Sequence, residues 1–229
     1  MAFKTRATLL GLVVSGLFLA QPAAATPFTV TAWAPAGGAP VSITKTDAPT
    51  RTYNGSGGGF VMTNTSPGSV ESFVSLCVDI FQFIPGGTPG EYTLDAGGLS
   101  LNSTTRNDLG RLATMFLAAA TTPGAGQNAA AFQLAIWEIL YEHNTSTYNL
   151  GTGSFYSNST ASAPHTIAQG WLNQINDPNN SANGYSLNVY TSTGLQDQVT
   201  FKSVPEPATL GLLGLGLIGI GLVRRRRKA

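Results

Sequence analysis

Residues 73–84, with the sequence FVSLCVDIFQFI, are predicted to form a β-strand, which Pro85-Gly86-Gly87 ends. Successive side chains of a strand point to opposite faces. One face of this strand is nearly all apolar, so we expect it to lie against a hydrophobic core. The other face carries Cys77, which is the only cysteine of the chain, and Asp79.

Weaker strand signals lie on both sides of this segment. Residues 28–33 alternate apolar and polar side chains, residues 60–62 are FVM, and residues 185–189 alternate before Val199 and Phe201 near the end of the body. The glycine-rich run at 55–59 is predicted to be a flexible turn. It is not a phosphate-binding loop, because no Gly-Lys-Ser/Thr follows it.

Three helices are predicted between the two groups of strands. Residues 107–120 carry apolar side chains at spacings of three and four, and the candidates for their N-cap are Thr104, Thr105 and Asn107. A second helix is expected over residues 128–142 with Asn128 as N-cap, and a third over about 164–175 with Pro164 in its first turn. Strands, then helices, then strands predict an α+β fold, with a β-rich, sandwich-like or barrel-like part and a three-helix subregion.

The chain has 229 residues, of which only 10% are charged. Its basic residues are concentrated at the two ends, so residues 26–223 keep five basic and all eleven acidic residues, a net charge of −6. A nucleic-acid-binding protein needs a basic surface to displace counterions, so we expect no nucleic-acid partner. One cysteine and two histidines leave little for a metal site, and we expect neither a metal nor a cofactor.

Residues 1–25 have the three parts of a secretory signal peptide in the required order. Lys4 and Arg6 provide the positive region, an apolar stretch follows from residue 7 to residue 20, and Ala23-Ala24-Ala25 provides small residues at a cleavage site. The stretch is too short to span a bilayer comfortably. We therefore expect the exported body to comprise residues 26–203.

Residues 204–229 form a second tripartite signal. Pro205-Glu206-Pro207 is followed by an apolar run over residues 208–223 and by a basic cluster formed by Arg224, Arg225, Arg226, Arg227 and Lys228. Sixteen apolar residues are short for a membrane span, but glycines and snorkelling arginines accommodate the deficit. The positive-inside rule keeps the arginines cytoplasmic and leaves the body outside.

This tail resembles the PEP-CTERM sorting signal of Gram-negative exported proteins, with Pro205, Glu206 and Pro207 as the motif itself. The resemblance implies recognition by an exosortase, which is an intramembrane cysteine protease that cuts near the motif. The body would then pass from the inner membrane to the cell surface or the extracellular matrix. A permanent single-span anchor is the simpler alternative.

Cys77 and Gln133 are the candidate functional pair. A free thiol in an exported protein is exposed to oxidation, so the lone cysteine is either buried as a small apolar group or used covalently. A thiolate that attacks a carboxamide expels ammonia and leaves an internal thioester, provided that water is kept out. Gln133 shares a predicted helix face with Ile136 and Trp137, where its amide needs hydrogen-bond partners.

Two segments are similar to the motifs of Cys-Gln thioester domains of the TQxA type. Leu76-Cys77-Val78-Asp79 matches the cysteine half, and Gln133 is followed by Trp137 four residues later, as in the glutamine half. Phe132 stands where these domains frequently have Thr. Neither Gln82 nor Gln127, the rival acyl donors, has a Trp four residues on.

The resemblance implies that Cys77 is the thioester thiol and Gln133 the acyl donor, with Asp79 and Trp137 as supporting residues. These domains are exported adhesin modules of mixed strands and helices, and their thioester forms an amide with a partner's amine. We therefore expect a surface protein, not an enzyme, that attaches covalently to an amine or hydroxyl on a protein or polysaccharide. The alternatives are a structural matrix or biofilm protein, associated with exopolysaccharide, whose buried Cys77 is free, and a hydrolase of matrix polymers, although the acid/base constellation that a hydrolase needs is missing.

Overall fold

The computed structural model describes residues 28–64, 71–84, 90–95, 101–143, 147–180 and 182–204. The predicted signal peptide and sorting tail lie outside these residues. Within them, no helix is both long and apolar enough to cross a membrane. The elements in chain order are β1 (Phe28–Lys45), β2 (Arg51–Asn64), β3 (Glu71–Cys77), β4 (Gly90–Asp95), α1 (Ser103–Thr121), α2 (Gly126–Tyr141), β5 (Phe155–Ser157), α3 (Ala163–Asn176), β6 (Tyr185–Thr191) and β7 (Gln198–Ser203).

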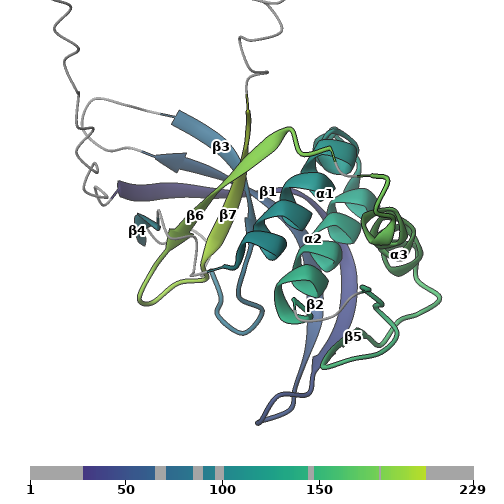
Figure 1. Cartoon of the computed structure of the whole chain (residues 1–229). Helices are drawn as coiled ribbons and strands as arrows, with labels where there is room; N and C mark the ends of the chain where they lie inside the picture. The colour runs from purple at the N-terminus through teal and green to yellow at the C-terminus, as the bar shows by residue number, and fades with distance from the viewer. Residues whose placement is uncertain are drawn as a thin grey trace, which may run out of the picture.

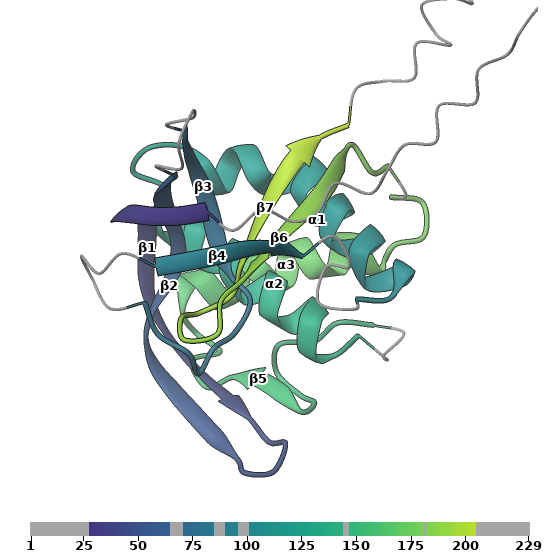
Figure 2. The same ribbon diagram turned by 90° about the vertical axis from the view of Figure 1, so that its left-hand side faces the viewer.

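The strands form one curled antiparallel sheet with the order β2-β3-β7-β6-β4-β1-β5. The long strand β1 also pairs with β2, so six strands close on one another and β5 lies on the outer end of β1. The three helices gather on one side of this sheet, as Figure 1 and the turned view of Figure 2 show. The predicted α+β class, with a barrel-like part and a three-helix subregion, is confirmed.

Two separate sets of apolar side chains fill the fold. The larger set lies between the sheet and the helices and includes the buried face of α2. The smaller set lies within the curled sheet and is built around the fully buried Met62 and Tyr92. In strand β3, the Leu76 side chain faces the helices and the Ser75 side chain faces the opposite side of the sheet. Both side chains are buried, so both faces of the second half of β3 are covered.

The predicted strand over residues 73–84 is too long. Strand β3 ends at Cys77, and the chain bends from Val78 onward, with Phe83 66% exposed. Val78 and Ile80 are nevertheless buried. The bend packs alternate side chains against the core, so the period-two pattern continues past the end of the hydrogen-bonded strand.

The predicted turn at residues 55–59 is wrong, because these glycines lie inside β2 and pair with β1. The two strands approach so closely there that a Cβ on Gly58 would collide with the carbonyl oxygen of Gly37. Gly58 also has a φ of +152°, which side-chain-bearing residues rarely adopt. The glycines therefore serve close backbone contact, not chain reversal.

The helices lie where they are predicted, with different caps. Asn102 caps α1, since its Oδ1 accepts a hydrogen bond from the Thr105 backbone at 2.8 Å. Helix α2 begins after Ala125 without a side-chain cap, and Asn128 lies inside its first turn. Pro164 lies in the first turn of α3, as expected.

Candidate functional site

The structure brings Cys77 and Gln133 together, although they lie 56 residues apart in the chain. The Cys77 backbone N–H donates to Gln133 Oε1 at 2.8 Å, and Gln133 Nε2 donates to the Cys77 carbonyl oxygen at 2.8 Å. Gln133 is fully buried and Cys77 is 5% exposed. Both ends of the Gln133 amide thus have partners on a single residue, which satisfies the requirement for a buried carboxamide.

The local backbone explains why this contact forms. Strand β2 pairs with β3 as far as the Gly59–Leu76 pair, and its next residue is the constrained Gly58. The backbone N–H and carbonyl of Cys77 lie past the last residue pair with β2, so they need another hydrogen-bond partner. A glutamine amide offers one donor and one acceptor, as a peptide group does, and Gln133 reaches them from the middle of α2.

The Cys77 thiol has other neighbours. Its Sγ donates to Gln196 Oε1 at 2.9 Å, and Gln198 Nε2 lies 3.9 Å from the sulfur. The Gln198 Oε1 accepts a hydrogen bond from Ser75 Oγ at 2.9 Å. Three glutamines therefore surround Cys77: Gln133 on its backbone, and Gln196 and Gln198 on its sulfur.

The thiol is held in its neutral form. The pKa of Cys77 is raised to about 12, chiefly by burial; the hydrogen bond from Gln198 opposes the rise, and the nearby charge of Asp79 adds to it. The nucleophile in thiol chemistry is the thiolate. Cys77 therefore reacts at neutral pH only where its proton is removed during the attack itself.

Asp79 is placed beside the site, not on the sulfur. Its backbone carbonyl accepts a hydrogen bond from Gln196 Nε2, and its Oδ2 accepts one from the Asp197 backbone at 3.3 Å. Burial raises the pKa of Asp197 to about 6, and the charge of Asp79 contributes to the rise. Asp79 thus holds the segment that carries Gln196, and its charge also acts on the thiol directly.

Trp137 and its neighbours keep the pair dry. Trp137 is 2% exposed and packs edge-on against Tyr53, with ring centroids 6.3 Å apart. Ile136 is fully buried, and the Tyr141 hydroxyl donates to the Val78 carbonyl at 3.3 Å. Phe132 is also buried, and its ring packs against Trp171 and Phe201.

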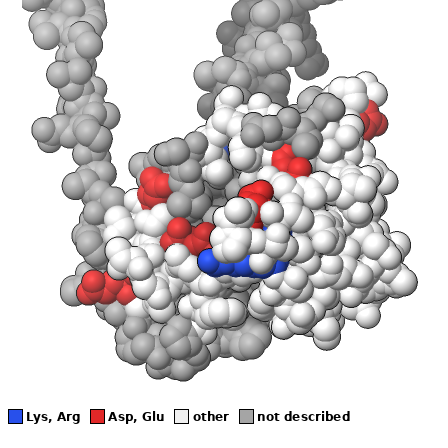
Figure 3. Space-filling model, turned by 90° about the horizontal axis from the view of Figure 1, so that it is seen from below, with Lys and Arg blue, Asp and Glu red and all other residues white. Residues whose placement is uncertain are grey.

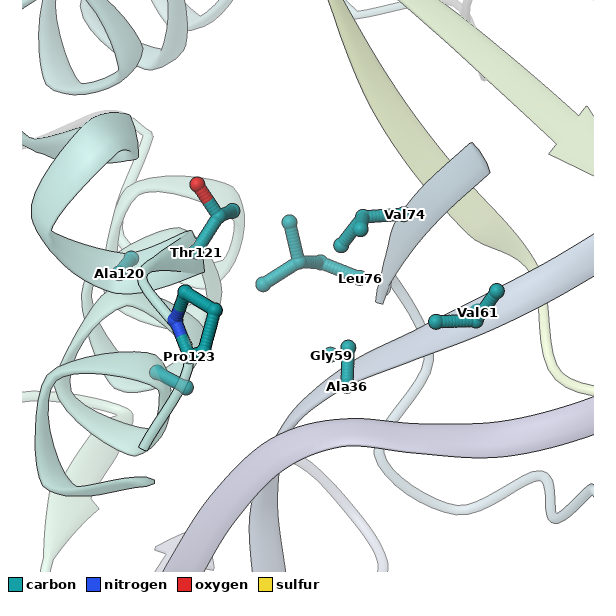
Figure 4. A pocket seen from close by; sticks show the side chains of 9 residues that line it. Ala36, Gly59, Val61, Val74, Leu76, Ala120, Thr121 and Pro123 are labelled. Atoms are coloured by element: carbon teal, nitrogen blue, oxygen red, sulfur yellow. The ribbon is translucent and has the colours of Figure 1, made fainter. Parts of the chain in front are cut away.

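An apolar hollow of about 220 Å³ is lined by neighbours of Cys77 and Gln133, although not by these two residues themselves. Leu76, one residue before Cys77, and Ala129, one helical turn before Gln133, both line it. Figure 4 shows Leu76 and Val74 on the strand side facing Ala120, Thr121 and Pro123 on the helix side. Val74 is 36% exposed, so the hollow is reached from solvent.

Sequence reasoning missed Gln196, Gln198 and Ser75. The only signal for the two glutamines is their spacing of two at the start of a strand, which places both on one face. The rival donors that the sequence offered, Gln82 and Gln127, are exposed and make no hydrogen bond to Cys77. Among the described residues, no three His, Cys, Asp or Glu side chains are arranged to hold a metal ion.

Residues 203–228 match the family described as the PEP-CTERM protein-sorting motif. The motif residues Pro205, Glu206 and Pro207 and the cluster Arg224–Arg227 all fall within this match and outside the described residues. A sorting motif of this kind implies export through the membrane to the cell surface and processing by exosortase. No curated protein and no solved structure matches the chain.

Proposed function

We propose that the exported body attaches covalently to a partner surface through a thioester between Cys77 and Gln133. The observation that supports this most directly is the burial of the Gln133 carboxamide against Cys77, with both amide ends on that one residue. Cys77 and Gln133 are also the residues that match the thioester-domain motifs.

Formation of the bond requires no cofactor. Cys77 Sγ attacks Cδ of Gln133, the S–C bond forms, and the C–N bond to Nε2 breaks. The thiol proton leaves with Nε2 as part of ammonia. Attack by a partner's amine then forms an amide to Gln133 and returns the proton to Cys77, so each molecule reacts once and does not turn over.

The hydrogen bond from the Cys77 N–H favours this chemistry. It lies on Gln133 Oε1, where negative charge develops when sulfur adds to the carbonyl. Because the site is buried, this donor acts without competition from water. The same burial protects the finished thioester from hydrolysis until a nucleophile enters.

The partner group that we propose is an amine or hydroxyl on a protein or polysaccharide. The apolar hollow beside Leu76 and Ala129 favours a lysine among these, because a lysine has an apolar four-carbon stem that buries well below its amine. Methylamine lacks such a stem and reports the bond alone.

Intact-mass measurement of the exported protein tests the proposal. The wild type is expected to weigh one ammonia less than its processed sequence, and to gain one methylamine on treatment. Cys77→Ala and Gln133→Ala should each restore the sequence mass and block the methylamine adduct. Gln127→Ala is the matched control on the exposed side of α2 and should behave as wild type. A full sequence mass for the wild type, with one titratable thiol after denaturation, would end the proposal.

A structural matrix or biofilm protein with a free, buried Cys77 is the second candidate. The observation that favours it is the direction of the thiol, which donates to Gln196 while Gln133 is satisfied by the backbone. In that case Gln133 acts only as a partner for the end of β3. The mass of the wild type separates the two candidates.

A further inference from the structure

The point where the chain leaves the folded body is fixed to the sheet and to a helix. The Val204 backbone N–H donates to the Gly184 carbonyl at 2.8 Å, which continues the ladder between β6 and β7. The Gly184 N–H in turn donates to Thr114 Oγ1 on α1 at 2.7 Å. Figure 1 shows the chain leaving at the end of β7, away from the tip of the β1–β2 hairpin.

The sorting motif begins at the next residue, so the body has no spacer. Residues 205–207 alone separate Val204 from the apolar run at 208–223. An extended chain covers at most roughly 3.3–3.6 Å per residue, so Val204 lies within about 14 Å of Ala208. A headgroup layer takes about 5–8 Å of that distance on each side of a bilayer.

The length of the apolar run draws the body closer. Sixteen residues in a helix rise about 24 Å, against a hydrocarbon core of about 30 Å. Residues that flank a short span are pulled toward the apolar boundary. If the tail is inserted as such a helix, the surface around Val204 would be held close to the headgroups.

This surface carries two basic side chains among polar and apolar ones. A hollow of about 440 Å³ opens beside Val204 and carries Arg106 on its wall. Ser186 lines the same hollow and pairs across the ladder with Lys202, so the exposed Lys202 side chain lies on that face. Two of the five basic residues of the body are thus gathered here. We call this surface the exit rim; it comprises Ser103, Arg106, Asn107, Asn183, Ser186 and Lys202.

We propose that the exit rim is a membrane-docking surface that rests on anionic phospholipid headgroups while the sorting tail is inserted. Exosortase then acts on a motif that is held between a folded body and the bilayer. The inference needs the tail in the membrane and does not depend on the thioester. The opposite end of the molecule, seen from below in Figure 3, carries acidic side chains around one basic patch.

Dye quenching on the full chain in vesicles tests this. Two variants in a Cys77→Ala background carry one labelled thiol each, Ser186→Cys in the exit rim and Thr50→Cys at the exposed hairpin tip. With a quencher on the lipid headgroups, the dye at 186 should be quenched several-fold more than the dye at 50. Equal quenching at the two positions would overturn the proposal.

Inserting a linker distinguishes quenching that is due to the short tether from quenching that is due to contact with the headgroups. Ten Gly/Ser residues inserted between Val204 and Pro205 should remove the quenching at 186 in uncharged vesicles and leave part of it in vesicles containing phosphatidylglycerol. That part should fall with added salt and with Lys202→Glu, and not with Arg51→Glu near the hairpin. A different result would reject lipid binding: quenching in anionic vesicles that changes neither with salt nor with Lys202→Glu, together with slower removal of the tail in cells. The exit rim would then be a contact surface for the protease.

Discussion

Opening the proposed thioester with methylamine should destabilise the folded body by an amount that the chain length sets. The bond would join residues 56 apart, Cys77 and Gln133. A cross-link that closes a loop of this length lowers the entropy of the unfolded chain and stabilises the fold by about 4 kcal/mol. Methylamine removes that constraint and leaves every other side chain in place.

Urea unfolding at 25 °C of untreated and methylamine-opened protein measures this difference. With an m-value of about 2 kcal/mol/M, the midpoint of the opened form should fall by about 2 M. The opened form should also show a larger m-value, because its unfolded state is less compact. Cys77→Ala treated in the same way should not change. An adduct that forms in full and leaves the midpoint unchanged would refute the reasoning on loop closure.

Three further predictions concern the body without the thioester. Burial raises the pKa of Glu138 from 4.5 to about 8. The contribution of Glu138 to stability is therefore complete below pH 4.5 and is lost as the pH rises toward 8. Glu138→Gln should make the midpoint of urea unfolding less dependent on pH between these two values. Arg111 pairs with buried Asp108 at 3.0 Å and donates to three backbone carbonyls, one in the last turn of α3 and two beyond its end. Arg111→Met should therefore cost about 3–5 kcal/mol in urea unfolding, and a loss below about 1 kcal/mol would contradict a buried pair. Gly58→Ala should lower the midpoint more than Gly124→Ala, because both glycines have positive φ but only Gly58 faces a backbone atom that a Cβ would strike.

The fold class was accessible from the sequence because periodicity and order are local signals. The helix that carries Gln133 and the strand that carries Cys77 both appear where their patterns predict them. Element ends were less accessible. Val78 and Ile80 are buried beyond the end of β3, so burial without strand pairing gave the same pattern.

The glycines of β2 show why composition misleads. A run of glycines is typical of a turn, and only the approach of Gly37 to Gly58 explains their place in a strand. That approach depends on pairing between distant segments, which no local pattern contains.

The site was accessible only in part. The Cys77–Gln133 pair followed from a resemblance, since their spacing in the chain does not imply contact. Gln196 reaches the sulfur from 119 residues away, from the segment just before β7, and its spacing from Gln198 does not indicate a contact with Cys77.

The position of β7 between Cys77 and the start of the sorting motif has a mechanical consequence. Gln198 pairs with Cys77 at one end of this strand, and Val204 leaves from the other. Tension between a captured partner and the chain end at Val204 would run along the strand axis. It would load the ladder bonds to β6 in shear, so that they resist together and do not open one at a time. A body built in this way would bear pulling from a moving surface better than one whose tether left beside the point of attachment.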